Sequence, residues 1–180
     1  MRQETRTKRL AAAGVCLALC MVLPLLTGQI PQIGRALGPM HIPVLLCGFI
    51  AGPFYAAIVG FVAPLLRFMV FGMPPLIPTG AAMCFELATY GLVSGLLYKK
   101  LPQKTAFIYL SLVAAMLSGR VVWGVARVLL VGLAGAPFSF ELFIAGAFID
   151  AIPGIVAHIL LIPVVVMALK HSKVFAQLTA

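Results

Sequence analysis

Residues 10–26 read LAAAGVCLALCMVLPLL, an unbroken apolar run that follows the basic residues Arg6, Lys8 and Arg9. About 20 such residues, rising 1.5 Å each in a helix, cross the hydrocarbon core of a bilayer. A secretory signal peptide also begins with basic residues and an apolar run, but here no small-residue cleavage site follows. We therefore predict a retained transmembrane helix over residues 8–26.

The rest of the chain is equally apolar. Of its 180 residues 63% are hydrophobic and 9% are charged, whereas an ordinary soluble domain carries about 25% charged residues. So few charges cannot cover a water-facing surface. We predict an all-α integral membrane protein in which residues 1–180 form one domain.

Turn-forming residues divide the chain into six predicted helices, at residues 8–26, 42–50, 54–71, 79–98, 106–133 and 142–169. The segment MPPLIP at residues 73–78 ends the third helix, because proline lacks an amide donor and disfavours helix in the residue before it. Residues 42–50 are too few to span a bilayer alone. We expect them to form a short or tilted helix beside the loop that precedes them.

The basic residues predict the orientation of these helices. Most lie in three clusters: Arg2, Arg6, Lys8 and Arg9; Lys99, Lys100 and Lys104; Lys170 and Lys173. Lys and Arg stay preferentially on the cytoplasmic side, and six helices place all three clusters there. We therefore predict cytoplasmic termini, a plasma-membrane location in a prokaryote, and outward loops near residues 28–40, 72–78 and 135–139. The formal net charge of +9 then reflects orientation and not nucleic-acid binding.

Ionisable residues inside apolar helices are costly and usually face a protein interior or cavity. Arg120 and Arg127 are two helical turns apart and share a face with Trp123. Glu86 and Arg127 each lie about two turns from the outer ends of their helices, so we expect them at similar depth. The hypothesis is an outward-facing polar pocket, with these candidate residues: Arg67, Thr79, Met83, Glu86, Tyr90, Trp123, Arg127 and Asp150.

A structural interpretation stands beside this hypothesis. Glu86 or Asp150 can pair with an arginine solely to neutralise buried charge, and Arg120 is the arginine for which such a pair is preferred. Arg67 can extend to the membrane surface from the outer end of its helix. His158 is interpreted as a hydrogen-bonded core histidine.

Several function classes find no support in the sequence. It contains no GxxxxGK[ST] phosphate loop, no HExxH metal motif and no GxSxG nucleophile motif. The four cysteines lie in apolar segments without metal-ligand spacing and are interpreted as small buried hydrophobes. We therefore expect no catalytic residue, no metal and no cofactor. An intramembrane enzyme would need a constellation that Glu86, Asp150 and His158 do not obviously make.

The chain resembles the substrate-binding S component of an energy-coupling factor (ECF) transporter over nearly its whole length. The order and spacing of several segments carry the resemblance: GVCLA at 14–18, HIP at 41–43, CGFIAGP at 47–53, VGF at 59–61, MPPLIP at 73–78 and YGLVSGLLYK at 90–99. The resemblance implies a small vitamin bound at the outer side, at the first, third and fifth loops and helices four to six. It also implies a membrane scaffold subunit and two cytoplasmic ATPases as partners.

In that family an Ala-xxx-Ala pair on the first helix meets the scaffold. Gly14 stands here in the place of the first alanine, and Ala18 follows four residues later. Small residues at this spacing permit close helix approach in lipid, so we predict Gly14 and Ala18 as a partner interface; packing inside the chain is the alternative. Many relatives also carry an acidic residue near Pro64, which this chain lacks.

The ligand is predicted only by class. Arg67, Arg127 and the loop residue Arg35 favour an anionic vitamin, pantothenate- or folate-like. A hydroxymethylpyrimidine- or thiamine-like ligand would instead use Glu86 and ring stacking on Trp123 or Tyr90. The alternative function is a non-transporting membrane scaffold of similar layout, with buried charges paired to one another and no outward cavity.

Overall fold

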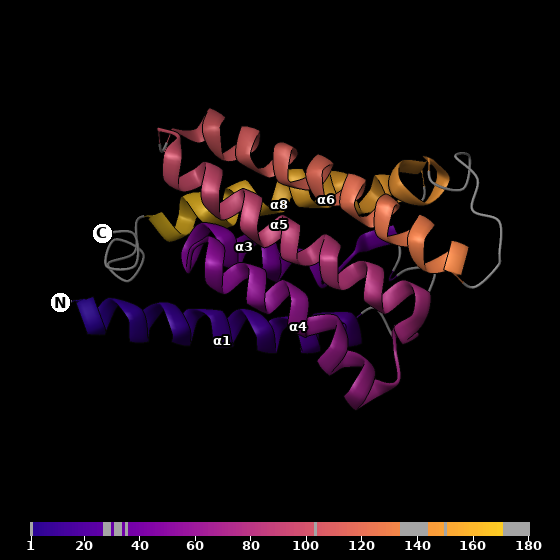
Figure 1. Cartoon of the computed structure of the whole chain (residues 1–180). Helices are drawn as coiled ribbons and strands as arrows, with labels where there is room; N and C mark the ends of the chain where they lie inside the picture. The colour runs from indigo at the N-terminus through magenta and orange to yellow at the C-terminus, as the bar shows by residue number, and fades with distance from the viewer. Residues whose placement is uncertain are drawn as a thin grey trace.

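The computed structural model describes residues 2–26, 30, 34, 36–102, 104–133, 144–149 and 151–170, and the regular structure among them is helical. The long helices run along a common direction, side by side, with a short helix between them (Figure 1). In chain order the elements are α1 (Arg2–Leu26), α3 (His41–Ile50), α4 (Pro53–Phe71), η1 (Leu76–Gly80), α5 (Ala81–Lys100), α6 (Thr105–Leu133), η2 (Ala145–Ile149) and α8 (Ile152–Lys170).

Five helical segments are long and apolar enough to cross a membrane: Thr5–Leu26, Pro53–Phe71, Leu76–Lys100, Thr105–Gly132 and Ile152–Lys170. The predicted helical membrane protein is therefore confirmed. Helix α3 has 10 residues, which at 1.5 Å each is about 15 Å and half of a bilayer core. The described residues thus hold five candidate spans and one short apolar helix, and six full spans remain a prediction.

Two helix boundaries differ from the prediction. Helix α1 begins at Arg2 and not near Lys8, so its basic first turns continue the apolar helix. The helix predicted over residues 142–169 is divided into the π-helical turn η2 and α8, with Ala151 in a turn between them. Pro153 explains the start of α8, because proline is tolerated in the first turn, where its missing N–H is not needed.

The predicted break at residues 73–78 is confirmed. Helix α4 ends at Phe71, and Gly72, with a φ of 70°, donates its N–H to the carbonyl of Phe68. Ile77 has extended backbone angles within η1. This segment turns the chain back into α5 at one end of the molecule.

Helix α5 lies at the centre of the bundle and packs against α3, α4 and α6. Small residues allow the backbones to approach closely. A side chain added at Gly91 would lie 2.6 Å from the backbone of Ala56 on α4, and one added at Gly95 would lie 2.6 Å from Pro53 N. Residues on α5 are thereby fixed relative to α3 and α4, which positions the site described below.

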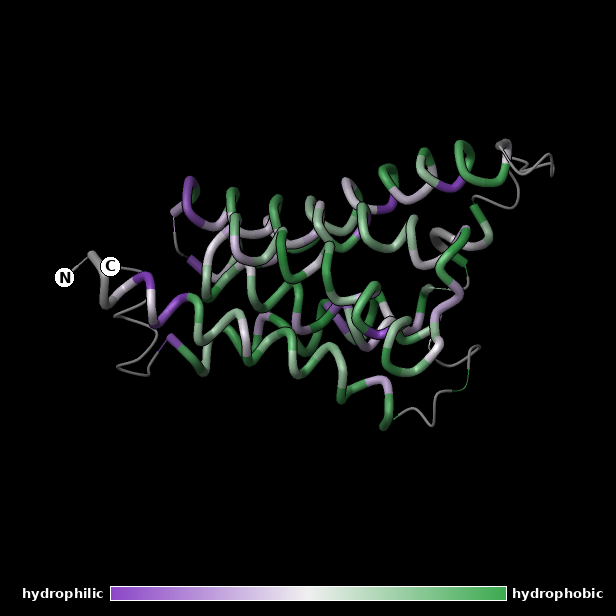
Figure 2. The backbone as a smooth tube through the Cα atoms, turned by 60° about the horizontal axis from the view of Figure 1, so that its bottom comes forward, coloured by the Kyte–Doolittle hydropathy of each residue, from purple (hydrophilic) through white to green (hydrophobic). Residues whose placement is uncertain are grey.

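The described basic residues gather at one end of the molecule. Lys170 Nζ, at the end of α8, lies 5.6 Å from the ring centroid of Tyr98 near the end of α5. Hydrophilic colour marks the start of α1 and the α5–α6 turn at this same end, while hydrophobic residues dominate the helices between (Figure 2). The arrangement agrees with the predicted charge pattern, and the cytoplasmic side of this end remains a prediction.

Candidate functional site

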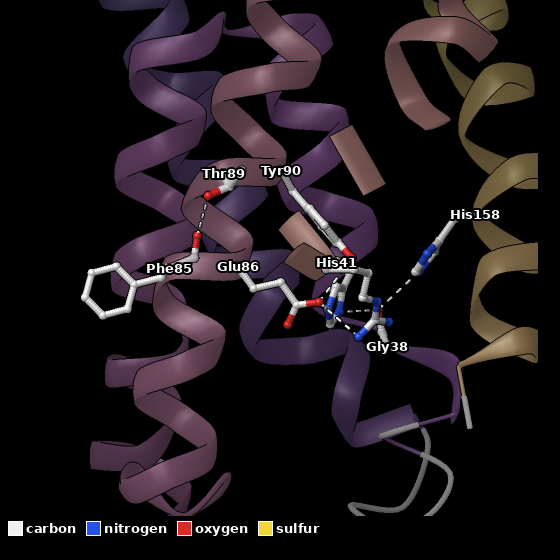
Figure 3. Close-up of polar contacts among 8 residues, drawn as sticks. Gly38, His41, Phe85, Glu86, Thr89, Tyr90 and His158 are labelled. Carbon is white, nitrogen blue, oxygen red and sulfur yellow. Dashed lines mark hydrogen bonds and ion pairs between the residues drawn. The ribbon is translucent and has the colours of Figure 1, made fainter. Parts of the chain in front are cut away.

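Glu86 on α5 is the centre of a buried polar cluster. Its side chain is 1% exposed, and Arg120 Nη1 on α6 lies 3.0 Å from its Oε1 atom. The hydroxyl of Tyr90, one turn further along α5, donates a hydrogen bond of 3.0 Å to the same oxygen. His41 Nε2, at the start of α3, lies 3.5 Å away. Three helices therefore place polar groups on one carboxylate oxygen (Figure 3).

Two histidines join this cluster to α8. His41 Nδ1 lies 3.1 Å and His158 Nε2 lies 3.3 Å from the carbonyl oxygen of Gly38, and their rings stack with centroids 5.9 Å apart. A carbonyl only accepts, so each of these ring nitrogens donates. Gly38 has a φ of 54°, and a side chain there would lie 2.8 Å from His41 Nδ1. Glycine is therefore needed where the first loop meets α3 and α8.

Two buried nitrogens in the cluster have no hydrogen-bond partner among the described residues, Arg120 Nε and His41 Nε2. The separation of His41 Nε2 from Glu86 is an ionic contact distance, without the geometry of a hydrogen bond. Leaving a buried polar group unsatisfied costs about 1–3 kcal/mol. These nitrogens are therefore suited to bind a polar group of a ligand.

The Tyr90 ring is held by the helix that it faces. Any side chain at Gly119 on α6 would overlap this ring, and the ring centroid lies 5.4 Å from that of His41. This packing points the hydroxyl at Glu86 and limits ring stacking on Tyr90 by a ligand.

A second group of candidate residues lies where α6 meets η1. Arg127 Nη1 donates a hydrogen bond of 3.1 Å to the hydroxyl of Thr79, and its guanidinium carbon lies 5.5 Å from the Trp123 ring centroid. A side chain at Gly146 on η2 would come within 3.0 Å of the same Trp123 ring. The structure thus brings together Arg127, Thr79 and Trp123, as the pocket hypothesis expects.

The other predicted site residues lie in different settings. Arg67 is 4% exposed and donates a 2.9 Å hydrogen bond to the carbonyl of Met21 on α1, with its guanidinium 4.9 Å from the Phe71 ring centroid. These contacts join α4 to α1. Met83 is half-buried against the apolar core. Asp150 lies outside the described residues, as do the loop residues Arg35 and Glu141.

An apolar cavity of about 170 Å³ adjoins the Glu86 cluster between α6 and α8. Its lining residues are Val113, Met116, Leu117, Arg120, Ile155 and Ile159. Arg120 therefore faces both the carboxylate of Glu86 and this cavity.

The sequence prediction missed two members of the cluster. His41 was noted only within a motif, and Arg120 was assigned to a structural pair and left out of the candidate site. Glu86 does pair with an arginine, but that arginine is Arg120 and not Arg127. The usable signal was the distance of both residues from the short α5–α6 turn.

Gly14 and Ala18 are both exposed on α1, and a side chain added at Gly14 would meet nothing within 4 Å. Among the described residues, no group of three or more His, Cys, Asp or Glu side chains is placed to hold a metal ion. All four cysteines are free and buried, which agrees with their interpretation as small hydrophobes.

Comparison with known proteins gives one family. No curated protein and no solved structure matches the chain. The model of the family described as the ECF transporter, substrate-specific component, matches residues 8–172. This match spans every described transmembrane helix and agrees with the apolar bundle and its buried polar cluster. The chain belongs to the family of substrate-specific components of ECF transporters.

Proposed function

We propose that this chain captures a small vitamin or vitamin precursor at the outer face of a prokaryotic plasma membrane for ATP-driven uptake. Members of its family are substrate-specific membrane components of ECF importers and serve in transport, not catalysis. The observation that carries the proposal is the cluster around Glu86, in which Arg120 and His41 each keep one buried nitrogen without a hydrogen-bond partner among the described residues.

The depth of the cluster suits a site that opens outward. Glu86 lies about 21 Å from Lys100 along α5, and Arg120 about 22 Å from Thr105 along α6, at 1.5 Å per residue. With the lysine-rich turn on the cytoplasmic side, both lie in the outer half of a bilayer core about 30 Å thick. Arg127, Thr79 and Trp123 lie beyond them, toward the predicted outer surface.

We assign the ligand to two levels of this site. Arg127, Thr79 and Trp123 form the outer level, and Glu86 and Tyr90 form the inner level. Met83 and Asp150 remain proposed ligand contacts, and so does Arg67, although its hydrogen bond to α1 supports a structural role.

An anionic vitamin, pantothenate- or folate-like, is the first candidate ligand, because Arg127 offers a cation at the outer level. A hydroxymethylpyrimidine- or thiamine-like ligand would use Glu86 and stack on Trp123. The pairing of Glu86 with Arg120 is also what a non-transporting scaffold would need to neutralise buried charge. Membership of a transporter family supports uptake over that alternative.

We further propose that Gly14 and Ala18 contact the membrane scaffold subunit, which acts with two cytoplasmic ATPases. Their exposure on α1 and the open space beside Gly14 support this interface, because small residues let two helix backbones approach closely in lipid.

Native mass spectrometry of the purified chain, followed by denaturation, tests the binding function by identifying any released small molecule. Affinity for that molecule is then compared in Arg127→Ala, Glu86→Ala and the control Val125→Ala, which changes an exposed side chain on α6. Loss of a hydrogen bond to a charged group costs about 1.5–3 kcal/mol, so we expect at least about tenfold weaker binding in both site variants. Parental affinity in both would show that the pocket is assigned wrongly.

A further inference from the structure

The cavity between α6 and α8 has the size of a single small ring. Its volume is about 170 Å³, and an apolar protein cavity of about 150 Å³ is known to bind benzene. Because it adjoins the proposed ligand site through Arg120, it can hold one part of a ligand whose polar end lies at Glu86.

The lining limits what that part can be. Five of the lining residues are apolar: Val113, Met116, Leu117, Ile155 and Ile159. A charged or strongly polar group would lose its hydration there without a partner. A ring meets the opposite conditions, since it is apolar and the thioether of Met116 packs well against aromatic edges.

Arg120 adds a directional requirement. Its Nη1 atom is engaged by Glu86 at 3.0 Å, whereas its buried Nε atom has no acceptor among the described residues. A guanidinium only donates, so the group that completes Arg120 is an acceptor such as a carbonyl oxygen or an unprotonated ring nitrogen.

We propose that this cavity receives an uncharged ring of about the size of benzene from the transported ligand, and that a hydrogen-bond acceptor at the ring's edge binds Arg120 Nε. The inference rests on the proposed function and names the chemistry of one part of its substrate. It leaves the outer part of the ligand free to carry the charge that Arg127 would bind.

A lipid acyl chain is the competing occupant. Val113 is 39% exposed and Leu117 is 52% exposed, so lipid reaches this side of α6. An acyl chain would fill the apolar volume but would bring no acceptor to Arg120 Nε, whose burial without a partner costs about 1–3 kcal/mol. The ring with an acceptor satisfies both the cavity and the arginine.

Two fluorinated probes test the proposal, 4-fluorobenzamide, which carries a carbonyl acceptor, and 4-fluorotoluene, which does not. Binding to the chain in nanodiscs is measured by fluorine NMR, with empty nanodiscs subtracted. We expect the benzamide to bind at least about tenfold more tightly than the toluene, because a hydrogen bond to a charged donor contributes about 1.5–3 kcal/mol.

Variants on both helices locate the probe. Val113→Phe on α6 and Ile159→Phe on α8 fill the cavity, and either should weaken 4-fluorobenzamide binding at least about tenfold, since overpacking a filled site is costly. Val121→Phe and Val164→Phe make the same change at exposed positions on the same two helices and should bind the probe like the parent. Two filling variants guard against the failure of one to fold.

Three results would overturn the proposal. They are absence of benzamide binding, equal binding of the two probes, and displacement of a copurified phospholipid, not of a probe, by the filling variants. The proposed function fails separately, if the parent releases no small molecule on denaturation. If it releases one and Val113→Phe leaves the amount unchanged, the function stands and this inference is wrong.

Discussion

Replacing Glu86 by glutamine tests whether the buried ion pair stabilises the fold. Glutamine keeps the shape of the side chain, and its amide oxygen can still accept the hydrogen bond from the Tyr90 hydroxyl. What it removes is the negative charge 3.0 Å from Arg120 Nη1. Glu86→Gln therefore isolates the electrostatic part of the cluster.

The expected loss follows from the burial of the pair. Two unit charges about 4 Å apart attract by about 4 kcal/mol at an effective dielectric constant of about 20. Removing one partner of a buried pair typically costs about 3–5 kcal/mol, because the other charge stays buried without compensation. Glu86 is 1% exposed, so we expect Glu86→Gln to lower the free energy of unfolding by about 3–5 kcal/mol.

Unfolding in mixed detergent micelles, followed by the fluorescence of Trp123, the single tryptophan, measures this loss. Arg120→Gln and the double variant complete a cycle, and we expect a coupling energy of about 2–3 kcal/mol. Thr89→Val is the control, because its hydroxyl bonds only to Phe85 within its own helix. A coupling energy below about 0.5 kcal/mol would refute an ion pair that stabilises the fold.

Three further predictions concern packing, assembly and orientation. Gly119→Ala forces the Tyr90 ring to move, so the same unfolding measurement should show a loss of about 1–3 kcal/mol, and unchanged stability would contradict the close packing. Gly14→Leu should change the stability of the isolated chain by less than about 0.5 kcal/mol yet reduce copurification of the scaffold subunit; full copurification would remove Gly14 from the interface. Lys104→Cys should react with a membrane-impermeant thiol reagent only after cells are opened, against the parent with its four buried cysteines, and labelling of intact cells would reverse the proposed orientation.

The helices were predictable because lipid imposes strong constraints on sequence. Continuous apolar runs mark α1, α4, α5, α6 and α8, and the prolines at residues 73–78 mark the break between α4 and α5. The start of α1 was predicted too late, because its first turns are polar and carry no hydrophobic signal. The start of α8 depends on Pro153, whose position in a first turn differs little in sequence from one inside a helix.

The partner of Glu86 was predicted wrongly for a geometric reason. Arg120 and Arg127 share a face of α6 and differ by about 10 Å in height, so the depth of α5 beside α6 decides between them. Counting from the outer ends favours Arg127, but those ends lie beside long loops. Counting from the short inner turn, between Lys100 and Thr105, places Glu86 level with Arg120.

His41 was beyond sequence reasoning, because no periodic pattern places it. Its position depends on the left-handed conformation of Gly38 and on a carbonyl that two histidines share. Both are tertiary features of a loop, which hydrophobic periodicity does not describe. The fold was therefore readable from single helices, whereas the site required knowledge of how loop and helices meet.

The unsatisfied nitrogens decide between a purely structural cluster and a binding cluster. A pair that only neutralises charge would be best served by neighbours that satisfy every donor, since each unsatisfied buried group costs about 1–3 kcal/mol. Arg120 Nε and His41 Nε2 lack such neighbours among the described residues, although the carboxylate of Glu86 is close to both side chains. A ligand that bonds to these nitrogens removes that cost in the bound state alone, so its binding energy appears as added resistance to unfolding. Stabilisation of the parent by its released small molecule, absent from Arg127→Ala and Glu86→Ala at the same concentration, is the behaviour that a structural ion pair alone does not produce.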